Sequence, residues 1–187
     1  MVTGQKVPDR CVVVFDEAYY EFVEDPEYAH GLDYVRQGRN VIVMHTFSKV
    51  YGLAGVRIGF GIGDPELISL ISRVKPPFDL SIVAENIAAE ALADDEFYNR
   101  TVSETAAEKA YYYAELDKLG LSYFRSQTNY ILIDVKMDCK KAAQALMEQG
   151  IIVRPAASYG FPTCIRITIG QHRENELFFK ALGKLVV

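Results

Sequence analysis

The chain has 187 residues, of which half are hydrophobic and 24 % are charged. A chain of this length and composition can bury roughly two-thirds of its unfolded surface, so we expect a globular protein with one or two hydrophobic cores. The net charge of −5 is spread along the sequence, which argues against nucleic-acid binding and against a polybasic contact with membranes.

The three cysteines, Cys11, Cys139 and Cys164, lie far apart and have neither CxxC nor histidine spacing. This pattern argues against a disulfide framework and against a zinc site, and it fits a reducing compartment. The first residues lack the apolar core of a signal peptide, and no stretch approaches the roughly 18 apolar residues of a membrane span. We therefore expect a cytoplasmic protein whose partners are small molecules or other protein subunits.

Two apolar, β-branched runs lie near the start of the chain, at residues 11–15 and 40–45. Both are typical of buried strands in a parallel sheet, and the connection between them, partly helical at 31–37, is long enough for the crossover that parallel strands need. Parallel strands end at the same edge of a sheet, where ligands of such folds bind. Asp16 and Lys49 follow the two runs, so we expect both at that edge.

The next predicted elements are a short strand at 57–61 and a helix at 66–74, which begins at Asp64-Pro65 because aspartate caps helices and proline suits their first turn. Residues 81–119 have a helical pattern almost throughout, rich in alanine. Within them, Asp94-Asp95 can cap a new helix. We therefore expect two helices here, the second of them long.

From Gly120 onward the pattern changes to short elements typical of a small α+β unit. The predicted strands lie at 121–124, 130–135, 151–153 and 164–169, and the predicted helices at 139–149 and 173–185. The change of pattern predicts two domains, at residues 1–119 and 120–187.

Lys49 stands just past a predicted strand, close to the hydroxyl residues Thr46 and Ser48 and ahead of the glycine-rich stretch 51–55. A solvated surface lysine is one interpretation. The other is a reactive amine, because a lysine whose pKa is lowered by burial or by nearby cations attacks aldehyde carbonyls in Schiff-base enzymes. The flanking hydroxyl residues and glycines are poorly explained by a surface charge, but the position of Lys49 alone leaves both interpretations open.

Arg57 enters an apolar stretch, where an unpaired guanidinium is unfavourable. Such a side chain needs an anion, and a phosphate ester suits its planar fork, with the hydroxyls of Thr46 and Ser48 as further donors. A salt bridge from Arg57 to Asp64 or Glu66 is the structural alternative.

Asp16 ends the first β-branched run, where its carboxylate needs a cationic or hydrogen-bonding partner. A protonated pyridine nitrogen is such a partner, and the pairing keeps the ring an electron sink. Helix capping is the alternative role for Asp16. Tyr19, three residues on, can donate its phenol to a ring oxygen, although the chain has 12 tyrosines and a packing role is the alternative.

Two stretches, DEAYYEF at 16–22 and TFSKVYGLAGVRIG at 46–59, resemble the core of the fold-type I, pyridoxal-phosphate-dependent class II aminotransferases, above all the histidinol-phosphate aminotransferases. Further stretches resemble the small domain of the same family, at 129–132, 150–155, 159–160 and 165–170. The resemblance implies an α/β fold, in which an incomplete parallel sheet of the cofactor-binding large domain is followed by a small α+β domain.

The resemblance also implies a role for each matching residue. Lys49 forms the Schiff base with pyridoxal 5'-phosphate and moves the substrate's α-proton. The remaining cofactor contacts are Asp16 at the pyridine nitrogen, Tyr19 at the ring hydroxyl, and Thr46, Ser48 and Arg57 at the phosphate. Arg166 and Arg154 bind substrate, the first at a carboxylate and both at the phosphate of histidinol phosphate. No metal is implied.

The implied function is transamination of histidinol phosphate with 2-oxoglutarate and glutamate, a step of histidine biosynthesis, in a homodimer. Aromatic amino-acid aminotransferases and threonine-phosphate decarboxylases share much of this pattern, and the run 52–55 favours an aminotransferase over the decarboxylase. Family members are nearly twice as long as this chain. We therefore expect the isolated chain to be incomplete for catalysis, with its sheet covered by dimerisation or rearranged packing. An inactive fragment or interaction module is the alternative.

Overall fold

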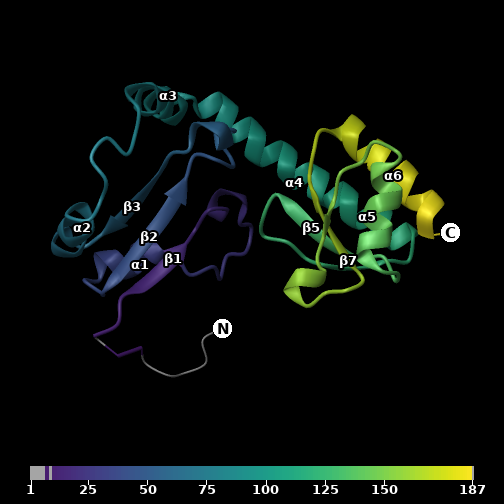
Figure 1. The fold of residues 1–187 in the computed structure, drawn as a ribbon, viewed down its shortest axis with the longest axis horizontal. Coiled ribbons are helices and arrows are strands. Elements are labelled where there is room, and N and C mark those ends of the chain that lie inside the picture. Colours follow the sequence, from purple (N-terminus) through teal and green to yellow (C-terminus); the bar gives the residue numbers. More distant parts are fainter. Residues whose placement is uncertain (1–6, 9, 187) are drawn as a thin grey trace. The chain divides into compact units, whose positions relative to one another are not determined.

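The two apolar runs near the start of the chain form a parallel pair of strands in the computed structural model, which describes residues 7, 8 and 10–186. β1 (Val13–Asp16) lies beside β2 (Val41–Thr46), and the short helix α1 (Gly31–Arg36) belongs to the connection between them. β3 (Gly59–Gly63) runs antiparallel on the other side of β2. The sheet order is thus β1-β2-β3 (Figure 1). The predicted parallel pairing is confirmed.

This sheet is covered on one face only. In β2, Val41, Val43 and His45 are buried, whereas Met44 on the opposite face is 41 % exposed. Val14 of β1 is 53 % exposed. The prediction that both strands are buried throughout is therefore wrong for this chain, because the described residues leave the second face of the sheet open.

Helix α2 (Pro65–Ser72) begins where the sequence predicts it. The side chain of Asp64 accepts a hydrogen bond from the backbone N–H of Glu66 at 2.9 Å. This N-cap satisfies a donor of the first turn that has no partner within the helix. The strand ahead of it starts at Gly59 rather than at the predicted Arg57.

The predicted pair of helices at 81–119 is confirmed, with the break at the expected place. α3 (Ile82–Ala93) is capped by the hydroxyl of Ser81, and α4 (Asp95–Lys118) by the carboxylate of Asp94, each accepting a backbone N–H of the following turn, at 3.1 and 2.9 Å. Among the described helices, none combines the length and the apolar character that a membrane span requires.

The C-terminal part of the chain forms an antiparallel sheet of four strands in the order β4-β5-β7-β6. The strands are β4 (Ser122–Phe124), β5 (Tyr130–Asp134), β6 (Arg154–Pro155) and β7 (Cys164–Thr168), with helices α5 (Cys139–Met147) and α6 (His172–Val186). Its hydrophobic core contains the buried aliphatic residues Leu116, Ile131, Ile133, Leu146, Ile165 and Leu182. The predicted strand at 151–153 is wrong, since the strand begins at Arg154 and Ile152 is 83 % exposed.

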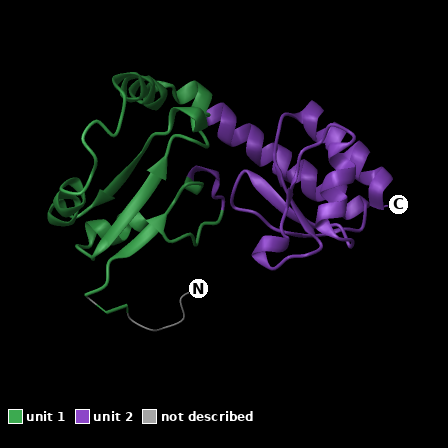
Figure 2. Ribbon diagram, viewed as in Figure 1, with its two compact units in different colours: residues 1–20, 25–98 green, residues 21–24, 99–187 purple. Residues whose placement is uncertain are grey.

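The chain divides by its contacts into two units, shown in Figure 2: residues up to 20 with 25–98, and residues 21–24 with 99–187. Most of α4 belongs to the second unit, because Tyr112 and Leu116 are fully buried in its core. The division therefore lies at residues 98–99, whereas the sequence predicts a domain boundary near residue 119. Because the units reflect contacts within this chain alone, that boundary stays a prediction.

Candidate functional site

Asp16 and Thr46 are the last residues of the two parallel strands, β1 and β2. In their register Asp16 stands opposite Met44, and the backbone N–H of Glu17 donates to the carbonyl of Met44 at 3.0 Å, which extends the ladder by one residue. The chain segments that carry Asp16 and Lys49 therefore leave the sheet at the same edge, as expected for a ligand site in a parallel sheet.

Lys49 lies beside Tyr19. The Nζ atom of Lys49 is 5.1 Å from the centroid of the Tyr19 ring, within the range of a cation–π contact. Both side chains are only partly exposed. The structure thus brings together the amine and the phenol that the sequence assigns to the same cofactor.

Thr46 and Ser48 form a small hydroxyl-lined turn just before Lys49. The Oγ1 atom of Thr46 donates to Oγ of Ser48 at 2.9 Å, and it accepts the backbone N–H of Ser48 at 3.1 Å. Local bonds of this kind fix a turn and orient its hydroxyls. The turn therefore presents two neutral hydrogen-bonding groups next to the lysine.

Arg57 lies in the loop ahead of β3, not in the strand as the sequence predicts. Its backbone is left-handed, with φ of 61°, and its Nη1 atom donates to the carbonyl of Ala54 at 2.8 Å. Among the described residues, no carboxylate forms an ion pair with Arg57, so neither Asp64 nor Glu66 plays that part. A non-glycine residue in this conformation costs about 1–2 kcal/mol, and such positions concentrate at functional sites.

Asp16 is exposed, and its Oδ1 atom accepts the backbone N–H of Ala18 at 3.2 Å. The expectation of a buried carboxylate is wrong, because β1 is an edge strand with one face open. Its carboxylate nevertheless stands at the predicted edge of the sheet and, among the described side chains, forms no ion pair. It is therefore available to a cationic ring nitrogen.

Sequence reasoning missed two buried polar residues next to this site, Glu17 and His45. They are 3 % and 7 % exposed, and His45 Nε2 lies 2.9 Å from Glu17 Oε2. The period-two alternation of a strand gives a signal that could have identified them, since residues 41, 43 and 45 share the covered face of β2.

Arg154 and Arg166, the predicted substrate residues, lie in the second unit as direct cross-strand partners of β6 and β7. The guanidinium carbon of Arg154 is 5.1 Å from the ring centroid of Tyr159, and that of Arg166 is 4.8 Å from the ring centroid of Tyr130. Two like charges on opposed residues are unfavourable unless an anion lies between or beside them. The pair is thus suited to a phosphate or carboxylate.

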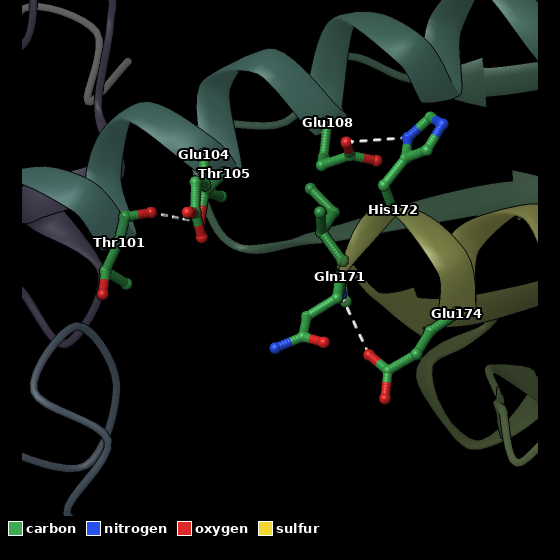
Figure 3. Close-up of a pocket in the computed structure, with 9 residues that line it drawn as sticks. Thr101, Glu104, Thr105, Glu108, Gln171, His172 and Glu174 are labelled. Atoms are coloured by element: carbon green, nitrogen blue, oxygen red, sulfur yellow. Dashed lines mark hydrogen bonds and ion pairs between the residues drawn. The ribbon is translucent and has the colours of Figure 1, made fainter.

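A cavity of about 580 Å³ lies elsewhere in the second unit, between α4 and the turn after β7 (Figure 3). Two of its three acidic residues are already bonded: Glu108 lies 2.9 Å from His172 Nδ1, and Glu174 accepts the backbone N–H of Gln171 at 2.9 Å. Within the described part of the chain, no cluster of three histidine, cysteine or acidic residues is placed to hold a metal ion. None of the residues that the sequence predicts for the site lines this cavity.

The chain, including the segments around Lys49, is similar to proteins of a known family. A model of the family "Aminotransferase class I and II" matches residues 5–182. The chain belongs to this family. Aminotransferases of this family depend on pyridoxal phosphate.

Curated relatives of this aminotransferase chain include two histidinol-phosphate aminotransferases. That of Moorella thermoacetica is 39 % identical over 97 % of this chain and 47 % of its own length. That of Brevibacillus brevis is 42 % identical over 97 % of this chain and 50 % of its own. The chain thus spans about half the length of the curated relatives it matches, and the predicted resemblance is confirmed.

Solved structures show the same mixed α/β fold. Histidinol-phosphate aminotransferase from Sinorhizobium meliloti, in complex with pyridoxal-5'-phosphate, is 29 % identical with a TM-score of 0.85, covering 96 % of this chain and 50 % of that one. The aminotransferase chain itself fits this cofactor. It offers an amine for the aldehyde at Lys49, two hydroxyls and Arg57 for a phosphate, and an available carboxylate at Asp16 for a ring nitrogen.

Proposed function

We propose that this chain is part of an aminotransferase that transfers the amino group between histidinol phosphate and 2-oxoglutarate, with pyridoxal 5'-phosphate as cofactor. The position of Lys49 carries the proposal: it follows a parallel strand, beside the Tyr19 ring and directly after the hydroxyl turn of Thr46 and Ser48. Support for the substrate comes from the curated relatives, whose names specify histidinol phosphate.

Each residue has a proposed task. Lys49 would hold the cofactor at its aldehyde carbon, and the Lys49 amine would be the base that takes the proton from the substrate's α-carbon. Asp16 would keep the ring nitrogen protonated, and Tyr19 would donate its phenol to the ring hydroxyl. When bound, the cofactor supplies an electron-poor ring that draws electrons from the α-carbon. The phosphate is held by Thr46, Ser48 and Arg57.

Arg154 and Arg166 provide the proposed anion site for substrate. Two arginines on directly opposed strand positions suit the phosphate of histidinol phosphate better than the neutral side chain of an aromatic amino acid, which favours the first substrate over the second. The carboxylate of glutamate or 2-oxoglutarate is the second anion that Arg166 binds.

We also propose that catalysis needs more than this chain. It spans about half of its curated relatives, and one face of its sheet is exposed, with Val14 at 53 % and Met44 at 41 %. Contiguous exposed apolar surface commonly marks a contact with further polypeptide. Further polypeptide, within a homodimer, would complete the site.

Cofactor binding by the chain is tested by titration with pyridoxal phosphate, followed by the visible absorbance of a Schiff base and by borohydride reduction. We expect a covalent adduct on Lys49, identified by peptide mass, and no adduct in Lys49→Ala. Before reduction, added histidinol phosphate should displace Lys49 from the Schiff base, and so prevent labelling of Lys49, at a lower concentration than phenylalanine does. No adduct at saturating cofactor would contradict the proposal for this chain.

A further inference from the structure

Glu17 and His45 form a buried pair beneath the proposed cofactor site. Each side chain is almost inaccessible to solvent, at 2 % and 4 %, and His45 Nε2 lies 2.9 Å from Glu17 Oε2. Glu17 directly follows Asp16, and His45 directly precedes Thr46. The pair therefore joins the two chain segments that carry the proposed site.

The pair lies on the covered face of the sheet. The bond from Glu17 N–H to the Met44 carbonyl continues the parallel register, so that Glu17 stands opposite His45. Successive residues of a strand point to opposite faces. Asp16 and Thr46 consequently face one side of the sheet, while Glu17 and His45 bond to each other on the other side.

The carboxylate of Glu17 is bonded on both of its oxygens. Besides His45, it accepts the backbone N–H of Gly31 at 2.7 Å and the hydroxyl of Tyr28 at 3.3 Å, both on Oε1. Burial, the negative charge of Glu17 and this hydrogen bond raise the pKa of Tyr28 to about 12. The phenol therefore stays protonated as a donor, and the buried charge of Glu17 is fully compensated.

The imidazole of His45 is held between two aromatic rings. Tyr20 stacks on it with ring centroids 4.2 Å apart, and Phe60 of β3 meets it edge to face at 5.2 Å. These contacts fix the plane of the ring, so the Nε2 atom points in one direction only, toward Glu17.

A buried polar pair adds little stability by itself, because two well-packed apolar residues of similar volume often stabilise a core as well or better. What such a pair supplies is a directional link between two segments. We propose that Glu17 and His45 are positioning residues, which fix the ends of β1 and β2 so that Asp16, Tyr19 and Lys49 meet the cofactor together. This inference rests on the proposed function.

Two variants of the full chain separate positioning from general stability. In His45→Gln the side-chain amide can still donate to Glu17, whereas His45→Leu has similar volume and no donor. We measure pyridoxal phosphate affinity by Schiff-base absorbance, hydrogen exchange of the amides at 46–50, and the urea midpoint. His45→Leu should weaken cofactor binding and speed exchange at 46–50 by about tenfold or more, as loss of a supporting partner does around bound groups.

We expect His45→Gln to stay within about threefold of the wild-type chain in cofactor affinity and exchange, even if both variants lower the urea midpoint equally. Equal cofactor affinity and equal exchange in the leucine and glutamine variants would overturn the positioning role. If the wild-type chain forms no Schiff base, the proposed function fails for this chain, and exchange at 46–50 alone decides the pair. In that case, amide exchange at 46–50 in His45→Leu that is as slow as in the wild-type chain would reject the positioning role.

Discussion

The amine of Lys49 lies 5.1 Å from the centre of the Tyr19 ring. This contact predicts different results for two substitutions of Tyr19. Tyr19→Phe keeps the ring and removes only the hydroxyl, so cofactor affinity should fall about fivefold, the value of one hydrogen bond. Tyr19→Leu also loses the cation–π contact, worth about 0.5–1 kcal/mol, and should bind still more weakly. Titration with pyridoxal phosphate measures both; equal affinities for the two variants would contradict a role of the ring.

Arg57 predicts a separation between stability and phosphate recognition. Its left-handed backbone suits glycine, so Arg57→Gly should change the free energy of unfolding by no more than about 1 kcal/mol. The same variant should bind pyridoxal phosphate about tenfold more weakly, because a charge-assisted contact is lost, yet bind pyridoxal, which has no phosphate, as the wild type does.

Lys136 provides a matched control for this test. It is also a non-glycine residue with a left-handed backbone, with φ of 57°, but it lies in the second unit, in the turn after β5. Lys136→Gly should therefore leave the affinity for pyridoxal phosphate unchanged. An equal loss for pyridoxal and pyridoxal phosphate in Arg57→Gly would show that Arg57 does not hold the phosphate.

The cross-strand pair of Arg154 and Arg166 predicts a large effect on anion binding and a small effect on stability. Arg154→Gln relieves the repulsion of like charges on opposed residues but loses the contact with the Tyr159 ring, so the free energy of unfolding should change by no more than about 1 kcal/mol. Binding of histidinol phosphate, measured by calorimetry, should weaken about tenfold or more. The exposed Arg173 of α6 offers a control, and equal effects in Arg173→Gln would indicate non-specific attraction.

Tyr28 predicts a loss of stability in alkaline solution. Its pKa is raised from the ordinary value of 10.0 to about 12 by burial and by Glu17. A raised pKa in the folded state means that the stabilisation is complete below pH 10 and disappears as the pH rises through 12. The urea midpoint should fall across this window, and Tyr28→Phe should flatten the fall. An unchanged slope in Tyr28→Phe would assign the effect to other tyrosines.

The sequence predicts the local structure well where short-range rules determine it. Asp64, Ser81 and Asp94 begin helices where predicted, because their side chains satisfy the first-turn N–H groups directly. The edge that gathers Asp16 and Lys49 follows from two parallel strands and needs no further knowledge of the fold.

Long-range packing accounts for the residues that sequence analysis misplaced. Asp16 is exposed because nothing among the described residues covers its face of the sheet, which the apolar run of β1 does not reveal. Arg57 lies outside the strand because its own backbone is left-handed, which is incompatible with an extended strand. Glu17 and His45 pair across strands, so their relation appears only once the register is known.

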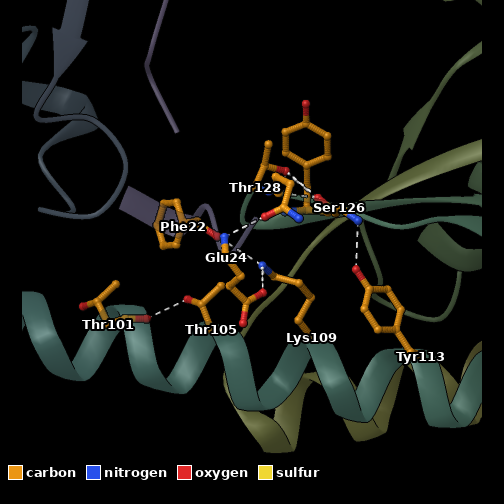
Figure 4. A network of polar contacts seen from close by, with 10 residues as sticks. Phe22, Glu24, Thr101, Thr105, Lys109, Tyr113, Ser126 and Thr128 are labelled. Atoms are coloured by element: carbon orange, nitrogen blue, oxygen red, sulfur yellow. Dashed lines mark hydrogen bonds and ion pairs between the residues drawn. The ribbon is translucent and has the colours of Figure 1, made fainter. Parts of the chain in front are cut away.

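Lys109 Nζ and Glu24 Oε2 form an ion pair at 2.7 Å, and the two side chains differ strongly in their exposure to solvent (Figure 4). The Lys109 side chain is 3 % exposed and also donates to the carbonyl of Phe22 at 3.3 Å, while the Glu24 side chain is 54 % exposed. Glu24→Gln leaves the buried ammonium group of Lys109 without its anionic partner and should lower the free energy of unfolding by about 3 kcal/mol. Lys109→Met keeps the packing of the aliphatic part of the side chain and leaves Glu24 in solvent, so it should lower the free energy of unfolding by less. Urea unfolding of the two variants measures the order, and a larger loss in Lys109→Met would show that the hydrogen bond to Phe22, rather than the charge of Glu24, holds the segment 21–24.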